Sequence, residues 1–286
     1  MSKRTLQRLN YTVGGIQLVL FVFLIVWLLS IDSESVSEDG LVSFPIGEYN
    51  QPLSEGRDHG SVSIETIVSL LAIFTLITGL VHIFAYARSS KSYQRGVEQG
   101  TNWVRWVEYS ITATIMLFVI AVTCGTNSTD GLVLMSVATL CCMLCGYISE
   151  ATATTNKRVS MLATGVGWLL LLAVFTVLLR RFWSIYTQTQ GTDSGPPPWV
   201  WAIVISLTLL FMSFGSIHLI HMRKQWQAGT SSVTPAFHQW IEVSYTVSSV
   251  VAKTLLVTLL ASGLFARTQE SGRLSAPSPR QSPSRG

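Results

Sequence analysis

The sequence predicts an all-α membrane protein, a bundle of seven transmembrane helices. Of its 286 residues, 49% are hydrophobic and only 12% are charged, whereas a soluble domain carries about 25% charged residues. Seven apolar runs are each close to the ~20 residues that cross a ~30 Å hydrocarbon core. The runs lie at roughly 11–30, 62–87, 103–124, 131–149, 159–179, 199–221 and 241–265.

The runs account for about half of the chain, which predicts one helical domain over residues 1–266 and no separate soluble domain. The first run follows three basic residues, Lys3, Arg4 and Arg8. It is too long for the apolar part of a signal peptide, so we expect a retained membrane anchor. The Ser/Pro/Arg-rich tail, residues 267–286, has the composition of a disordered segment.

The first loop, roughly residues 31–61, contains the stretch LVSFPIGEY, which is β-prone and includes Pro45 and Gly47. This composition favours a short β-hairpin over the end of the bundle, in a loop that we expect to be extracellular. A disordered acidic loop is the alternative, because the same segment holds seven acidic residues against Arg57 alone.

Lysine and arginine are distributed unequally between the two sides of the predicted bundle. The side that holds the N-terminus carries ten of them, and the other side carries seven, four of which are on the tail. Because basic residues near a membrane span favour the cytoplasmic side, we expect the N-terminus inside the cell and the C-terminus outside.

Lys253 lies near the middle of the last apolar run, with about twelve residues of helix on either side. Ionisable groups inside a membrane are costly and usually functional. A Schiff base or a nearby carboxylate would offset the cost of the amine. Glu108 is the only carboxylate well inside the third run, so it is the expected partner. An inert buried ion pair is the alternative interpretation.

Two further polar residues are expected near this pair. Ser249 lies one helical turn before Lys253 and therefore on the same face. His82 lies about six residues before the cytoplasmic end of the second run, at a depth similar to that of Glu108. His82 could equally be a hydrogen-bonded packing residue.

Several motifs resemble those of the heliorhodopsins. The run RWVEYS, from Arg105 to Ser110, resembles their third helix, and SVVAK, ending at Lys253, resembles their retinal-binding seventh helix. GLVH at His82, GYISE at 146–150, GVGW ending at Trp168 and ISLTLLFMSF on the sixth helix match in order and spacing. The resemblance covers nearly the whole chain apart from the tail, and it implies a rhodopsin-like seven-helix fold.

The resemblance implies roles for individual residues and a cofactor, all-trans retinal. Lys253 would form the Schiff base, Glu108 would be its counterion, Ser249 would lie beside it, and His82 would join a cytoplasmic polar network. The residues expected to line the polyene are Met116, Gly146, Trp168 and Phe211. The resemblance also implies a homodimer, because family members place a small sheet from the first loop at a dimer contact.

Some positions depart from the family pattern. Gln17 occupies a place on the first helix where a histidine is common, and an amide cannot accept a proton. On the sixth helix, Met212 replaces a common asparagine, and His218 stands where a glutamine is expected. His218 and His221 either extend a titratable path or are interfacial side chains, and we favour the second interpretation.

The leading functional hypothesis is a photosensor in the lipid bilayer, in which retinal isomerises from all-trans to 13-cis and an unknown partner receives the signal. Familiar microbial pumps have carboxylates where this chain has Ser249 and Val119, so we expect no pumping. Light-gated passive proton conduction through His82, Glu108 and His218 is the alternative.

The sequence contains no HExxH or GxSxG motif and is not expected to be an enzyme or to bind nucleic acid. Cys142 and Cys145 are interpreted as packing residues rather than a metal or redox site.

Overall fold

The computed structural model describes residues 3–30, 43–45, 61–88, 90–126, 128–188, 198–228 and 233–274. Seven helical segments within these ranges are long and apolar enough to cross a membrane, which confirms the predicted fold class. They are α1 (Lys3–Ser30), α3 (Ile64–Leu80) continued by the π-helix η1 (Val81–Arg88), α5 (Trp103–Thr123), α6 (Thr129–Thr152), α7 (Lys157–Gln188), α8 (Pro198–Ala228) and α9 (Pro235–Leu274).

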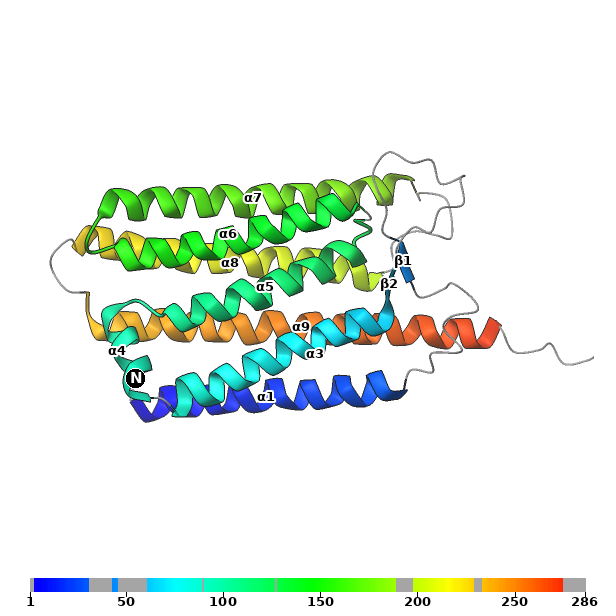
Figure 1. Cartoon of the computed structure of the whole chain (residues 1–286), viewed down its shortest axis with the longest axis horizontal. Helices are drawn as coiled ribbons and strands as arrows, with labels where there is room; N and C mark the ends of the chain where they lie inside the picture. Colours follow the sequence, from blue (N-terminus) through cyan, green and yellow to red (C-terminus); the bar gives the residue numbers. More distant parts are fainter. Residues whose placement is uncertain are drawn as a thin grey trace, which may run out of the picture.

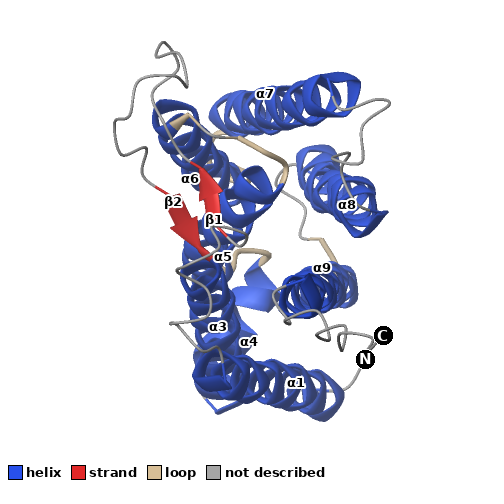
Figure 2. Cartoon of the chain, turned by 90° about the vertical axis from the view of Figure 1, so that its right-hand side faces the viewer, coloured by secondary structure: helices blue, strands red, loops and turns tan. Residues whose placement is uncertain are grey.

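The seven spans lie side by side along the long axis of the molecule (Figure 1). Seen from one end, α1, α3, α5 and α6 follow one another along one side, and α7, α8 and α9 complete the bundle on the other (Figure 2). A short helix, α4 (Ser90–Gln99), lies at one end, and two short strands lie at the opposite end. These are called the α4 end and the β end below.

The two strands form the small sheet expected in the first loop. β1 (Ser43–Pro45) lies within the LVSFPIGEY stretch and pairs antiparallel with β2 (Ser61–Ser63), with Phe44 opposite Val62. The second strand leads directly into α3, where the Ser63 hydroxyl accepts a hydrogen bond from the Thr66 backbone N–H. This N-cap satisfies one of the free N–H groups at the start of the helix.

The helices extend beyond the apolar runs. α7 ends at Gln188 and α8 at Ala228, whereas the apolar runs end near 179 and 221. α9 continues to Leu274, so part of the tail that we expected to be disordered is helical, and residues 275–286 lie outside the described residues. An apolar run marks only the stretch in the hydrocarbon core, whereas helical hydrogen bonding can continue into the polar interface.

Apolar side chains cover both the inside and the outside of the bundle, as a lipid environment requires. The fully buried set includes Phe74, Ile120, Leu178, Leu207 and Leu256. The outward-facing set includes Val19, Leu134, Leu162, Leu169 and Leu209, each more than half exposed. A soluble protein rarely exposes so much contiguous apolar surface, and the chain is an integral, multi-pass membrane protein.

Candidate functional site

The candidate site centres on an ion pair between Lys253 of α9 and Glu108 of α5. Lys253 Nζ lies 2.7 Å from Glu108 Oε1 and donates a second hydrogen bond, 2.6 Å long, to the Thr78 hydroxyl of α3. Lys253 and Glu108 are each only 2% exposed. Each charge therefore depends on the other for compensation, because water cannot solvate either one.

Thr78 belongs to the last turn of α3, directly before the chain widens into the π-helix η1. Irregular turns of this kind are frequent at functional sites. The ring of Tyr109, one residue after Glu108, has its centre 5.4 Å from Lys253 Nζ. The amine is thus held between a carboxylate, a hydroxyl and an aromatic ring that come from two neighbouring helices.

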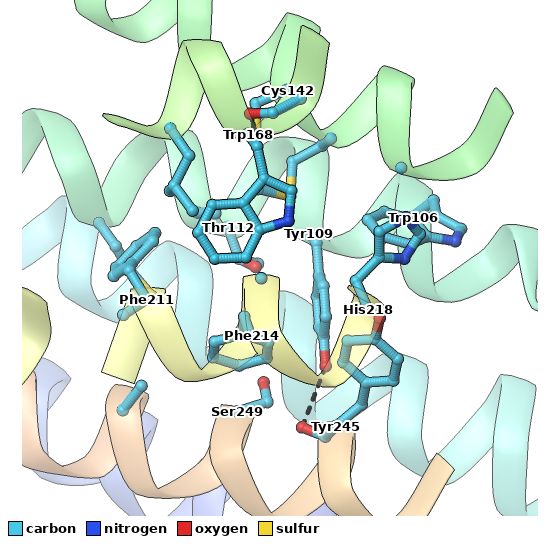
Figure 3. A pocket seen from close by; sticks show the side chains of 18 of the residues that line it. Trp106, Tyr109, Thr112, Cys142, Trp168, Phe211, Phe214, His218, Tyr245 and Ser249 are labelled. Carbon is cyan, nitrogen blue, oxygen red and sulfur yellow. Dashed lines mark hydrogen bonds between the residues drawn. The ribbon is translucent and has the colours of Figure 1, made fainter. Parts of the chain in front are cut away.

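A cavity begins at Lys253 and extends between α5, α6, α7, α8 and α9. Its walls are mostly apolar and aromatic, and Figure 3 shows Trp168, Phe211 and Phe214 on one part of the wall and Trp106 and His218 on another. The four residues expected along a polyene, Met116, Gly146, Trp168 and Phe211, all line this cavity. Ser249 lines it as well, one turn before the amine.

Other lining residues were missed by the sequence analysis. They include Trp106, Tyr109, Thr112, Cys142, Phe214 and Tyr245. The 3–4 residue spacing of Trp106, Tyr109, Ala113 and Met116 places them on one face of α5. The same spacing is typical of ordinary core residues, so the pattern alone would not identify a cavity.

Gly146 leaves space for the Trp106 side chain, which forms part of the cavity wall. A Cβ atom at this position would lie 2.2 Å from the Trp106 indole, far inside van der Waals contact. The same indole donates a 2.8 Å hydrogen bond from Nε1 to Glu150 Oε2. Gly146 therefore fixes the position of Trp106 between the cavity and Glu150.

Gly146→Ala is expected to displace the Trp106 indole and to lower the free energy of unfolding by about 1–3 kcal/mol, the usual cost of overpacking. Thermal unfolding of the purified chain in detergent measures this loss as a lower melting temperature. Gly165→Ala is the matched control, because no atom lies within 4 Å of a Cβ there. A Gly146→Ala melting temperature equal to that of the control would contradict the packing argument.

His82 and Gln17 lie in the interior but do not bond to the Lys253–Glu108 pair. His82 is 2% exposed, and its Nδ1 lies 2.8 Å from Asn10 Oδ1 on α1. Asn10 in turn lies within hydrogen-bonding distance of the Tyr93 hydroxyl of α4, at 3.5 Å. Gln17 is fully buried, and its amide has no hydrogen-bond partner within the described ranges. His82, Asn10 and Tyr93 thus form a chain of polar contacts that extends from the interior to α4.

A second buried ionic group lies toward the α4 end, and sequence reasoning missed it. Arg105 of α5 forms ion pairs with Glu150 of α6 and with Glu242 of α9. The three residues are 2–4% exposed. Asn102, the N-cap of α5, accepts from the Arg105 backbone N–H and donates a 2.8 Å hydrogen bond to Glu242 Oε1. Together with His221, described next, Arg105, Glu150 and Glu242 are called the Arg105 cluster.

The interfacial interpretation of His218 and His221 is wrong. His218 is 7% exposed and lines the cavity, with its ring 5.4 Å from that of Trp106. His221 is 2% exposed, and its Nδ1 lies 3.4 Å from Glu150 Oε1. Both histidines lie on the inward face of α8. The prediction was wrong because the apolar run was taken to end near residue 221, which placed the two histidines at the membrane surface.

Seven membrane helices around an apolar cavity that begins at a buried lysine define the rhodopsin fold. The chain is similar to Exiguobacterium sibiricum rhodopsin, with a TM-score of 0.65 and 12% identity over 94% of this chain and 98% of that one. It is also similar to the transmembrane domain and linker region of Salpingoeca rosetta rhodopsin phosphodiesterase (TM-score 0.59, 10% identity, 94% and 76% covered). A third similar structure is thermophilic rhodopsin (TM-score 0.56, 14% identity, 94% and 96% covered). At these identities the likeness establishes the fold alone.

The family model of heliorhodopsin matches residues 6–265, and the chain belongs to the heliorhodopsin family. No curated protein sequence matches the chain. The resemblance to this family that the sequence indicated is thereby confirmed. The chain is a retinal photoreceptor-type membrane protein.

Proposed function

We propose that retinal binds to Lys253 as a protonated Schiff base and that Glu108 is its counterion. The observation that carries this proposal is the 2.7 Å contact between Lys253 Nζ and Glu108 Oε1 at the start of the aromatic cavity. A positive charge in a low-dielectric site needs a nearby negative charge. Glu108 is the one carboxylate in contact with Lys253 in the described part of the chain.

The residues around the cavity fit a long apolar chromophore. Trp168 and Phe211 provide flat apolar walls, and Gly146 and Gly215 keep the side chains of Trp106 and Trp168 from being pushed into the space. Retinal, when bound, supplies light absorption and isomerisation from all-trans to 13-cis. Lys253 anchors it, and Met116 contributes a polarisable side chain to the wall.

The chain's own residues control the charge at the amine. Glu108 supplies the compensating negative charge, Thr78 accepts a hydrogen bond from the free amine, and Ser249 lies one turn away. His82 connects this region to α4 through Asn10. A change in the position of the amine would therefore alter the helix contacts of α3, α5 and α9 together. We propose that this rearrangement signals to a partner protein and that the chain has no enzymatic activity.

The simplest test is reconstitution. The purified full chain, mixed with all-trans retinal in the dark, should acquire an absorption band in the visible range. Extraction and chromatography of the bound chromophore before and after illumination should give the all-trans and 13-cis isomers. A chain that stays colourless with retinal would refute the proposal.

A light-driven proton pump is disfavoured by the residues on either side of the amine. Ser249 on α9 and Val119 on α5 stand where microbial pumps use carboxylates, and Val119 is fully buried. Passive light-gated proton conduction is the second candidate. The observation in its favour is that His218, like His82, is buried inside the bundle.

Illumination of cells or vesicles that contain the chain should produce no sustained pH change, because the described residues toward the β end include no buried carboxylate that could relay a proton. Under voltage clamp we expect no stationary photocurrent. Vesicles treated with a protonophore provide the baseline. A sustained current that reverses with the proton gradient would favour the channel, and His82→Ala and His218→Ala would then be tested for its loss.

We also propose that the α4 end faces the cytoplasm and that the chain forms a homodimer through its β end. The topology groups ten lysines and arginines at the α4 end, as the positive-inside rule requires. An epitope at residue 2 should be hidden in intact cells, and one after Gly286 should be accessible. Permeabilised cells are the control for the first epitope. The reverse pattern would refute this orientation.

A further inference from the structure

The Arg105 cluster has an unbalanced charge. It contains one guanidinium, Arg105, and two carboxylates, Glu150 and Glu242, and all three are buried. An uncompensated charge in a low-dielectric interior is very costly. With His221 neutral, the cluster would carry one net negative charge. One additional proton would make it neutral.

The hydrogen bonds indicate where this proton is held. Both oxygens of Glu150 face donors, which are Arg105, the Trp106 indole and the Asn102 backbone N–H. Both oxygens of Glu242 face donors as well. Carboxylates that accept from every side are stabilised in the ionised form. The additional proton is therefore expected on a base next to the two carboxylates rather than on either carboxylate.

His221 is the base in the right place. Its Nδ1 lies 3.4 Å from Glu150 Oε1, and its Nε2 lies 3.3 Å from His238 Nδ1. An imidazolium at this position would form an ion pair with Glu150 on its Nδ1 side and could donate a hydrogen bond from Nε2 to His238. Gln225, whose amide nitrogen lies 2.9 Å from His221 Nε2, fits either state, because half a turn of the amide exchanges its NH₂ for its oxygen.

The other groups around the cluster do not supply the charge. Both ring nitrogens of His218 lack a hydrogen-bond partner in the described part of the chain, so charging it would leave two unpaired donors. Tyr245 lies under the Arg105 guanidinium, 4.2 Å away, and is a neutral phenol. Burial raises the pKa of the Tyr93 hydroxyl, which therefore stays protonated and donates to Glu242. Lys253 is already matched by Glu108.

The cluster lies between two cavities. A small cavity at the α4 end is lined by Gly100, His221, His238 and Glu242. On the inner side, the Trp106 indole lies between Glu150 and the large cavity.

We propose that the Arg105 cluster is a proton-binding site that holds one exchangeable proton, carried by His221 as an imidazolium. We further propose that the net charge of the cluster changes the electrostatic potential in the chromophore cavity, where Trp106 forms part of the wall. The proton is bound at neutral pH and is lost as pH rises. Its loss leaves one buried negative charge, so the folded state becomes less stable in the same pH range. The binding of the proton is independent of retinal, and only its effect on colour rests on the proposed function.

The test is an isotope-edited infrared titration of the full chain without retinal, with labelled histidine and glutamate. Wild type should show a histidinium signal at neutral pH that disappears as pH rises and that is missing from His221→Gln. Glu150→Gln and Glu242→Gln should each remove the signal, because either change leaves a neutral pair with Arg105. Glu98→Gln, an exposed residue on α4, is the matched control and should keep it.

Glu242→Gln is the decisive variant because Glu242 pairs with Arg105 and, among the described residues, forms no hydrogen bond or ion pair with His221. Loss of the signal in this variant can follow only from the charge balance. A histidinium that persists in Glu242→Gln overturns the proposal, and so does a wild-type chain whose four described histidines are all neutral at neutral pH. The wild-type titration decides the matter even where a variant fails to fold.

With retinal bound, the visible band should shift along the same titration curve in wild type and should not shift in Glu242→Gln. If the absorption maximum of wild type does not change over the pH range of the histidinium titration, the proposed electrostatic coupling between the cluster and the cavity is wrong. A colourless chain with an intact histidinium titration supports the proton site and refutes the retinal proposal, so the two failures are distinguishable.

Discussion

Replacing Lys253 by alanine is expected to abolish the visible absorption band completely, because no other described lysine lies inside the bundle to bond retinal. Reconstitution with all-trans retinal, followed by absorption spectroscopy, measures the loss. Lys224→Ala is the matched control, since Lys224 is exposed near the end of α8. A coloured Lys253→Ala protein would refute the anchoring role.

This variant leaves Glu108 buried without its partner, which typically costs about 3–5 kcal/mol. Lys253→Ala could therefore lose colour by unfolding alone. The double variant Lys253→Ala/Glu108→Gln removes both buried charges and should recover much of the melting temperature. It should stay colourless, and this combination separates the loss of the anchor from the loss of the fold.

The spans and the central ion pair were predictable because their signals are local. An apolar run of about twenty residues identifies a span without knowledge of its neighbours. Lys253 and Glu108 stand out because ionisable residues within such runs are rare. Their pairing also follows from the sequence, since few other charges are available at that depth.

Other parts of the site depend on contacts that no local pattern reveals. Thr78 binds Lys253 across 175 residues of sequence, and a threonine in a membrane helix gives no sign of such a role. Arg105 and Glu242 lie 137 residues apart and near the ends of their apolar runs. There, each resembles a side chain that reaches the interface. Helix α4 was missed because, among its side chains with described burial, Tyr93 and Val97 are the apolar ones buried against the bundle. Two apolar residues are too few to form an apolar run.

The Lys253–Glu108 pair and the Arg105 cluster differ in how their buried charges are compensated. The Lys253–Glu108 pair balances itself, whereas the Arg105 cluster needs an added proton to do so. Trp106 and Tyr109 lie on the same helix as Arg105 and Glu108, and both line the cavity. α5 therefore carries one residue of each ionic group together with the aromatic rings between them. A change at either group should be detectable at the chromophore.

Glu108→Gln is expected to have the second-largest effect, a change of colour at neutral pH. The amide keeps the shape of the side chain but removes the negative charge 2.7 Å from Lys253 Nζ. The protonated Schiff base then loses its compensation, so it should release its proton at lower pH. Loss of one partner of a buried pair is worth about 3–5 kcal/mol, which corresponds to a shift of about two to four pH units in the midpoint.

The measurement is a spectrophotometric pH titration of the retinal-bound protein in the dark. Glu108→Gln should be largely deprotonated near neutral pH and absorb at shorter wavelength. At low pH, where the Schiff base stays protonated, the band should move to longer wavelength than in wild type. Glu65→Gln, in the first turn of α3, is the matched control and should titrate like wild type. An unchanged spectrum and midpoint in Glu108→Gln would exclude Glu108 as the counterion. Glu150 and Glu242 would be the next residues to substitute, because they are the other buried acids among the described residues.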